Sequence, residues 1–218
     1  MSRDIPANWP SQLDSGLAAM ALDLSDATRE RLLAFLGLLQ KWNRAYNLTA
    51  VREPDQMVSR QLLDSLAILP YIQAPSVLDV GAGGGLPGIP MAIACPDRHI
   101  TLLDSNSKKT RFLTQCVLEL GLDNVEVVHA RAEDYLPDQP FQQITSRAFT
   151  ALANLVTWCG HLLADEGQFL AMKGQFPEDE LAELPSDWRL REDVALSIPG
   201  CDGARHLLII DRVRTTGG

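Results

Sequence analysis

The stretch Val77-Leu78-Asp79-Val80-Gly81-Ala82-Gly83-Gly84-Gly85-Leu86-Pro87-Gly88 decides the fold of this chain. Its first four residues are predicted to form a buried strand, the glycines a tight loop, and residues 89–94 the start of a helix. Glycine lets the backbone turn sharply and approach a ligand closely. A glycine-rich loop that leaves a strand and opens a helix is the context in which nucleotide-like cofactors bind.

Two cofactor motifs fit this loop. Gly83, Gly85 and Gly88 satisfy the dinucleotide pattern G-x-G-x-x-G. Asp79, followed by Gly81, Gly83 and Gly85, satisfies the D-x-G-x-G-x-G pattern of S-adenosylmethionine enzymes. The second pattern fits the strand better, because its acidic residue lies inside the strand and its first glycine leaves the strand directly.

Two prolines near the start of the following helix also bear on the choice of cofactor. Pro87 and Pro90 lack N–H groups, so they weaken a helix N-terminus that would have to hold a pyrophosphate. S-adenosylmethionine has no phosphate and loses little by this. The loop therefore predicts S-adenosylmethionine. An NAD-dependent oxidoreductase and a glycine-rich turn without a ligand remain as alternatives.

Outward from this loop, the chain divides into two parts. Residues 1–75 are expected to form a helical extension packed on the core, and residues 76–218 an S-adenosylmethionine-binding methyltransferase domain. The apolar spacing of the first part predicts helices over residues 13–22, from the cap Ser25-Asp26 onward, and over 58–69.

The second part alternates between short strands and helices, which indicates an α/β fold with helices on both faces of a mostly parallel sheet. We expect a Rossmann-like methyltransferase fold with seven strands. No helix separates the last two strands, so they pair antiparallel, or one is inserted beside its predecessor. The predicted strands span residues 77–80, 99–104, 125–129, 142–146, 168–172, 188–198 and 206–213. The predicted helices span residues 89–94, 108–120, 152–163 and 178–184.

Composition excludes several classes of protein. The four cysteines are far apart in a chain of 218 residues and show no zinc spacing, so we expect no metal. No apolar run reaches 18 residues and the N-terminus lacks the run of a signal peptide, so we expect a soluble cytoplasmic protein. The net charge of −9 argues against tight non-specific binding to bare nucleic acid, but not against a local basic patch.

The residues that follow the strands are candidates for the site, since ligands in such sheets bind at the carboxyl ends of the strands. Asp104 ends the second strand, where a carboxylate accepts hydrogen bonds from both ribose hydroxyls. Ala132 and Glu133 follow the third strand, where they could frame the adenine.

Arg147 ends the fourth strand, near the point where amino-group methyltransferases of nucleic acids carry an N/D-P-P-Y/F tetrad. That tetrad is absent, and no cysteine stands there for a covalent cytosine mechanism. Arginine cannot act as a base at neutral pH, but it can hold an anion or donate to guanine O6. This favours a nucleophile that needs no deprotonation, such as guanine N7, which the enzyme must only place in line with the sulfonium methyl.

Basic residues gather at the same edge of the predicted sheet. They are expected to form a small phosphate-binding patch on an otherwise acidic protein. They are Lys108, Arg131, Arg147, Lys173 and Arg205.

These residues together resemble the RsmG (GidB) family of bacterial 16S rRNA guanine-N7 methyltransferases over residues 25–213. The segment K-W-N-R-A-Y-N-L-T and the continuation G-L-P-G-I-P are much more specific than the glycines. The resemblance rests on residues 41–49, Arg60, 63–65, the loop through Pro90, 102–105, 146–149, 172–174 and 205–206.

The resemblance implies methylation of N7 of guanine 527 in the 530 loop of 16S rRNA. The net charge of −9 favours a 30S particle or an assembly intermediate over naked 16S rRNA as the substrate, and naked rRNA remains as the alternative. The resemblance also implies that Gly81, Leu86, Ala132, Glu133 and Arg147 contact the cofactor or border its pocket, and that the basic residues face the RNA. A non-catalytic rRNA-binding or assembly module with the same fold remains the competing hypothesis.

Overall fold

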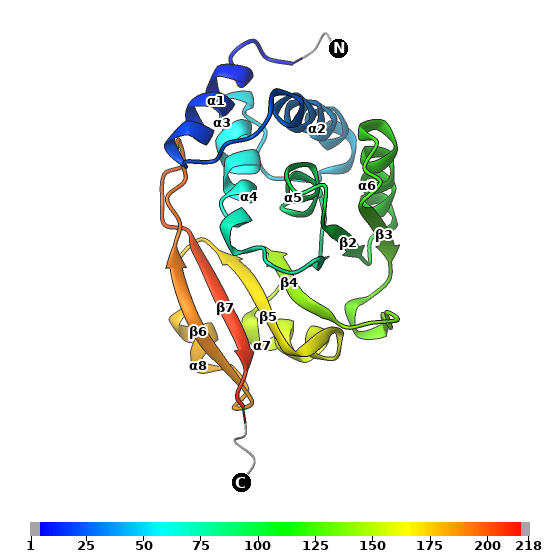
Figure 1. The fold of residues 1–218 in the computed structure, drawn as a ribbon, viewed down its shortest axis with the longest axis vertical. Coiled ribbons are helices and arrows are strands. Elements are labelled where there is room, and N and C mark those ends of the chain that lie inside the picture. Colours follow the sequence, from blue (N-terminus) through cyan, green and yellow to red (C-terminus); the bar gives the residue numbers. More distant parts are fainter. Residues whose placement is uncertain (1–4, 215–218) are drawn as a thin grey trace.

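A computed structural model describes residues 5–214, and within that range the strands form one seven-stranded sheet in the order β3-β2-β1-β4-β5-β7-β6 (Figure 1). The strands are β1 (Ser76–Val80), β2 (His99–Asp104), β3 (Val125–His129), β4 (Phe141–Arg147), β5 (Leu163–Lys173), β6 (Trp188–Ala195) and β7 (His206–Arg212). The first five are parallel, and β7 lies antiparallel between β5 and β6. The mostly parallel sheet is confirmed, and the last two strands combine both expected arrangements: they pair antiparallel, and β7 is inserted beside β5.

The two longest helices, α2 and α6, begin and end at residues with recognisable capping chemistry. Ser25 caps the long helix α2, because its hydroxyl accepts a hydrogen bond from the Thr28 N–H at 3.2 Å. Asn47 and Gly121, both in the left-handed conformation, end α2 and α6. The helices are α1 (Trp9–Ala19), α2 (Asp26–Tyr46), α3 (Pro54–Met57), α4 (Asp64–Leu66), α5 (Gly88–Ala94), α6 (Ser107–Leu120), α7 (Leu152–Cys159) and α8 (Glu178–Ala182).

The helix predicted over residues 58–69 differs from the expectation. Its first part is a π-helix over Val58–Leu63, flanked by the short helices α3 and α4, and a 3₁₀ turn follows at Leu69–Tyr71. Two further 3₁₀ turns lie at Ala132–Asp134 and Gly160–Leu162.

Two hydrophobic cores lie on the two faces of the sheet, because side chains alternate along each strand. Val77 and Leu102 point into the core that contains α1, α2, α5 and α6. Their neighbours Leu78 and Leu103 point into the core under α7. Figure 1 shows α2, α5 and α6 together above the sheet.

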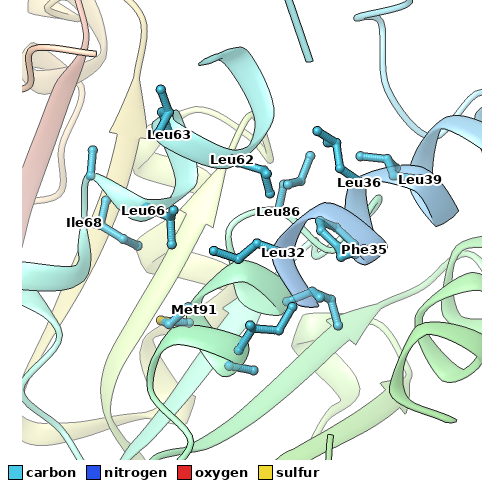
Figure 2. Close-up of a cluster of buried hydrophobic side chains, with 14 of the residues drawn as sticks. Leu32, Phe35, Leu36, Leu39, Leu62, Leu63, Leu66, Ile68, Leu86 and Met91 are labelled. Carbon is cyan, nitrogen blue, oxygen red and sulfur yellow. The ribbon is translucent and has the colours of Figure 1, made fainter. Parts of the chain in front are cut away.

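The N-terminal helices contribute much of the first core. Figure 2 shows Leu32 and Leu36 of α2 facing Leu62 and Leu66, with Met91 of α5 beside them. All five side chains are fully buried. Side chains before and after residue 76 therefore share one core. None of the helices between residues 5 and 214 is both long and apolar enough to cross a membrane.

Candidate functional site

The glycine loop forms at the carboxyl end of β1. Gly81 and Gly85 have φ angles of 68° and 79°, in the left-handed region that favours glycine. The N–H groups of Gly81 and Ala82 both donate to the carbonyl oxygen of Leu103, at 2.9 and 3.1 Å. The loop is thereby tied to the end of the neighbouring strand β2.

Asp79 lies beneath this loop and is fully buried. Its Oδ2 accepts a hydrogen bond from the Gly88 N–H at 2.9 Å, and burial raises the pKa of the carboxyl group to about 7. A dinucleotide motif that ended at Gly88 would direct this N–H toward a pyrophosphate. Because Asp79 occupies that donor, the geometry disfavours the NAD alternative.

A cleft of about 410 Å³ opens at the carboxyl ends of the central strands, and we call it the central cleft. Its lining includes four predicted cofactor residues, Gly81, Asp104, Ala132 and Glu133, and one predicted RNA-binding residue, Arg131. The full lining is Val80, Gly81, Leu103, Asp104, Ser105, Asn106, Lys109, Ala130, Arg131, Ala132, Glu133, Ala148, Phe149 and Trp158.

Asp104 is held in a fixed orientation in the central cleft. Its Oδ2 accepts from the Gly83 N–H at 2.9 Å and its Oδ1 from the Asn106 N–H at 2.8 Å. A carboxylate has about four acceptor positions, so each oxygen keeps capacity for one more hydrogen bond. Asp104 therefore fits the role of accepting hydrogen bonds from a pair of ribose hydroxyls.

Some predicted cofactor residues lie outside the lining of the central cleft. Leu86 packs its side chain into the first core near the leucines of α2 (Figure 2). Asp79 and Gly85 lie beneath the loop, and a side chain at Gly85 would press on Ile89. Gly83 contributes through its N–H, which orients Asp104. Direct contact between these residues and the cofactor stays a prediction.

Sequence reasoning missed three side chains that line the central cleft. Lys109 lies there, whereas the predicted Lys108 is exposed on the adjacent part of α6. Phe149 and Trp158 form an edge-to-face aromatic pair with ring centroids 6.0 Å apart. Phe149 belongs to the quoted segment 146–149, but no sequence signal distinguishes Trp158 from a core residue.

A second cavity of about 310 Å³ adjoins the central cleft, and we call it the basic pocket. Ala148 lines both cavities and has a φ of 51°, a backbone conformation that is uncommon for a residue other than glycine. The lining of the basic pocket is Asp64, Arg147, Ala148, Met172, Lys173, Gly174, Leu196, Arg205 and His206.

Arg147 is placed in the basic pocket by a cluster of partners. Asp64 lies between two arginines, with its Oδ2 at 3.3 Å from Nε of Arg147 and its Oδ1 at 3.1 Å from Nε of Arg205. Nη2 of Arg147 donates to the carbonyl oxygen of Arg60 at 3.0 Å and to Oε1 of Gln61 at 3.1 Å. Burial lowers the pKa of Arg147, and Asp64 opposes this effect, so the guanidinium stays charged. Arg147 does not line the central cleft, so a direct contact with the cofactor stays a prediction.

Lys173 lines the basic pocket, but its ammonium group has protein partners. Its Nζ lies 2.7 and 3.0 Å from the two carboxylate oxygens of Glu180 in α8 and 3.2 Å from the carbonyl oxygen of Thr150. An ammonium group has three donors, so all three are engaged. The predicted RNA contact of Lys173 would require it to exchange these partners.

His206, like Asp64, is a titratable side chain of the basic pocket that the sequence analysis did not assign to the site. It lines the basic pocket, and its Nδ1 lies 2.8 Å from Oδ1 of Asp193. In the part of the chain that the structure describes, no three His, Cys, Asp or Glu side chains are grouped so that they could hold a metal.

The strand order, the glycine loop after β1 and the acidic residue that ends β2 define a class of protein. A solved glycopeptide N-methyltransferase, MtfA, in complex with S-adenosylhomocysteine, has the same fold, with a TM-score of 0.61 at 11% identity over 70% of this chain and 87% of that one. The chain therefore has the fold of an S-adenosylmethionine-dependent methyltransferase.

The particular family follows from the sequence matches. A family model described as rRNA small subunit methyltransferase G matches residues 28–208. The ribosomal RNA small subunit methyltransferase G of Marinobacter nauticus is 69% identical over 94% of this chain and 95% of its own length. That of Pseudomonas syringae pv. tomato is 58% identical over 92% and 95%. The chain belongs to the rRNA small subunit methyltransferase G family, which confirms the resemblance stated from the motifs.

Proposed function

We propose that this enzyme transfers the methyl group of S-adenosylmethionine to N7 of a guanine in 16S rRNA, guanine 527 of the 530 loop. The observation that carries the proposal is the junction of two cavities at Ala148. One suits an adenosine-like cofactor, and the other is lined, within residues 5–214, by three cationic side chains, Arg147, Lys173 and Arg205, beside the single carboxylate of Asp64. A positively lined acceptor pocket fits a base that is attached to a phosphate backbone.

In the central cleft, four residues are assigned to the cofactor from their positions. Asp104 accepts hydrogen bonds from the ribose, Ala132 and Glu133 border the adenine, and the backbone at Gly81 faces the amino-acid part. When bound, S-adenosylmethionine supplies an electrophilic methyl group on a sulfonium. S-adenosylmethionine has no phosphate, so it does not require a free N–H group at the start of α5. The Gly88 N–H is bonded to Asp79 instead.

In the basic pocket, the side chains suit an acceptor that is already nucleophilic. Arg147 cannot take a proton at neutral pH, but it can donate hydrogen bonds to the O6 edge beside guanine N7. Asp64 is occupied by Arg147 and Arg205. The lone pair on N7 is free in the neutral base, so positioning in line with the methyl group is the main requirement.

His206 provides the sharpest test of the mechanism, because it is the basic-pocket side chain best suited to act as a base near neutral pH. If N7 attacks directly, His206→Asn keeps turnover within about threefold of the wild type, far less than the 10²–10⁴-fold that a general base supplies. The assay is transfer of a labelled methyl group to 30S particles from a strain that lacks this enzyme. A loss of 100-fold, or label on an exocyclic amine or a ribose, would refute the mechanism.

Arg147 tests whether the basic pocket takes part in methyl transfer. Arg147→Ala is expected to retain S-adenosylhomocysteine binding, measured by calorimetry, and to slow rRNA methylation by about 100-fold or more, to a residual rate that long incubations measure. Unchanged methylation would remove Arg147 from the mechanism. Methylation at no position by the wild type would favour the non-catalytic module.

The partner and the location follow from charge and from the substrate. With a net charge of −9, a structured 30S particle or assembly intermediate in the cytoplasm suits the enzyme better than naked RNA. Lys108, Arg131, Lys173 and Arg205 are proposed to face that RNA. We also propose that residues 1–75 serve the domain 76–218 as a helical extension.

A further inference from the structure

A line of hydrogen bonds runs from the N-terminal helices to Arg147. Gln61 lies on the π-helix and is fully buried. Its Nε2 donates to Oγ1 of Thr49 at 2.7 Å, and its Oε1 accepts from Nη2 of Arg147 at 3.1 Å. The Thr49 N–H in turn donates to Oδ1 of Asn43 at 2.9 Å. Asn43, Thr49 and Gln61 therefore link α2 to the end of β4.

The partners of Arg147 use only part of its guanidinium. Nε faces Asp64, and the two hydrogens of Nη2 are used by Gln61 and by the carbonyl oxygen of Arg60. Nη1 is buried and has no hydrogen-bond partner anywhere in residues 5–214. Because a guanidinium is planar, partners that fix Nε and Nη2 also fix the direction of the two Nη1 donors.

We propose that Gln61 is a positioning residue for methyl transfer. It holds the guanidinium of Arg147 in one orientation in the wall of the basic pocket, the cavity that would receive the acceptor base. This inference rests on the proposed function, in which Arg147 orients the acceptor. It also gives Thr49 a role, since its hydroxyl oxygen holds the amide of Gln61.

The chain offers a matched control in a second buried glutamine. Gln143 in β4 is 3% exposed, and its Oε1 accepts from the N–H groups of Gln73 and Ala74 at 2.8 and 2.9 Å. Its Nε2 donates to the carbonyl oxygen of Tyr71. Gln143→Leu therefore removes a buried amide with a comparable set of partners that does not touch the basic pocket.

The experiment compares Gln61→Leu, Gln143→Leu and Arg147→Ala. Methyl transfer to 30S particles gives kcat and KM, calorimetry gives the affinity for S-adenosylhomocysteine, and thermal melting gives stability. We expect Gln61→Leu to lower kcat/KM by about tenfold or more, as for the loss of a hydrogen bond to a charged group. Its cofactor affinity should stay within about threefold of the wild type. Gln143→Leu should melt at a lower temperature than the wild type but keep wild-type kcat/KM.

The double variant Gln61→Leu/Arg147→Ala separates positioning from a general structural role. If Gln61 acts through Arg147, the double variant is no slower than Arg147→Ala alone. The inference is overturned if the losses of kcat/KM in the two single variants multiply in the double variant. It is also overturned if Gln61→Leu loses no more kcat/KM than Gln143→Leu. If Gln61→Leu does not fold, the near-isosteric Thr49→Val removes the acceptor for Nε2 and is held to the same criteria. Methylation by the wild type at an atom other than N7 would refute the proposed function. The ratio of kcat/KM between Gln61→Leu and the wild type would still test the role of Gln61.

Discussion

At the scale of single residues, the side chain of Asp79 holds the start of α5 and is at the same time a fully buried carboxyl group. Its Oδ2 secures the start of α5 through the Gly88 N–H, while Oδ1 has no hydrogen-bond partner within the described range 5–214. Burial raises the pKa from 3.8 to about 7, so near neutrality the folded protein carries a carboxyl group that is only partly ionised. The stability of the loop therefore depends on pH.

Asp79→Asn is expected to remove this dependence. Because the pKa is higher in the folded than in the unfolded chain, the folded state binds more protons between pH 4 and 7, and wild-type stability falls as the pH rises through that window. Asparagine keeps an acceptor for Gly88 and does not titrate. The free energy of unfolding of the variant relative to wild type should rise across this window, by on the order of a few kcal/mol, and level off above it. Urea titrations at several pH values measure the free energy of unfolding of both proteins. Asp97→Asn, at an exposed site, is the control for the loss of one charge. A stability difference between Asp79→Asn and the wild type that does not vary with pH would contradict the prediction.

Gly81 provides a second prediction at this scale. A Cβ there would overlap the ring of Phe149, and φ is 68°. Gly121 has a similar φ of 59°, but a Cβ there would meet no heavy atom of the described residues within 4 Å. Both Gly81→Ala and Gly121→Ala should lose about 1 kcal/mol of stability from the backbone strain. Only Gly81→Ala should lose affinity for S-adenosylhomocysteine, by about tenfold or more, because Phe149 is pushed into the central cleft. Equal affinities in calorimetry would refute this.

The sequence allowed some of these residues to be placed and not others. Asp104 could be predicted because it ends a strand beside the glycine loop, at the edge of the sheet where ligands of such folds bind. Lys108 and Lys109 could not be told apart, since adjacent helical residues point in directions about 100° apart and the start of the helix was uncertain by one residue. Leu86 carries no local signal that its side chain enters the core.

At the scale of elements, the π-helix Val58–Leu63 leads into the Asp64 cluster. The Asp64 N–H bonds to the carbonyl oxygen of Ser59, five residues back, and Gln61 and Asp64 both contact Arg147. Apolar spacing predicts a helix here but does not reveal the turn type, because Leu62, Leu63 and Leu66 have the spacing of an ordinary α-helix. The π-helix depends on tertiary partners.

Ser25 at the start of α2 gives a prediction for a single element. Ser25→Ala removes the acceptor for the Thr28 N–H and should cost about 1 kcal/mol of stability. Methyl transfer should not change, because the cap lies at the far end of α2 from Asn43. Ser107→Ala is the control, since α6 is capped by Asn106 rather than by Ser107. Chemical denaturation measures both variants, and equal stabilities would contradict the prediction.

At the scale of the whole molecule, the N-terminal helices and the sheet share one core. Alternating strand and helix patterns were enough to predict the sheet and the positions of its strands. The pattern could not predict how extensively residues 1–75 pack against the sheet domain. An apolar helix face shows that a helix is buried, but it does not show which other element covers it.

Unfolding is therefore expected to be a single cooperative transition. Trp9 is fully buried and its Nε1 donates to the carbonyl oxygen of Pro54 at 2.9 Å. Trp9→Ala should cost about 3–5 kcal/mol and shift the midpoint of the entire transition. Circular dichroism and tryptophan fluorescence should report the same midpoint. Separate transitions for the two probes would show that residues before 76 unfold independently.

The ion cluster around Asp64 also bears on the biosynthesis of the enzyme. Its members come from three distant parts of the chain, and Arg205 lies 141 positions after Asp64. A nascent chain that has emerged only as far as β5 already contains every residue of the central cleft, but not the arginine that completes the basic pocket. The residues of the central cleft are thus synthesised before Arg205, and a translation product that ends in β5 lacks the arginine that pairs with Asp64 from β7's side of the sheet.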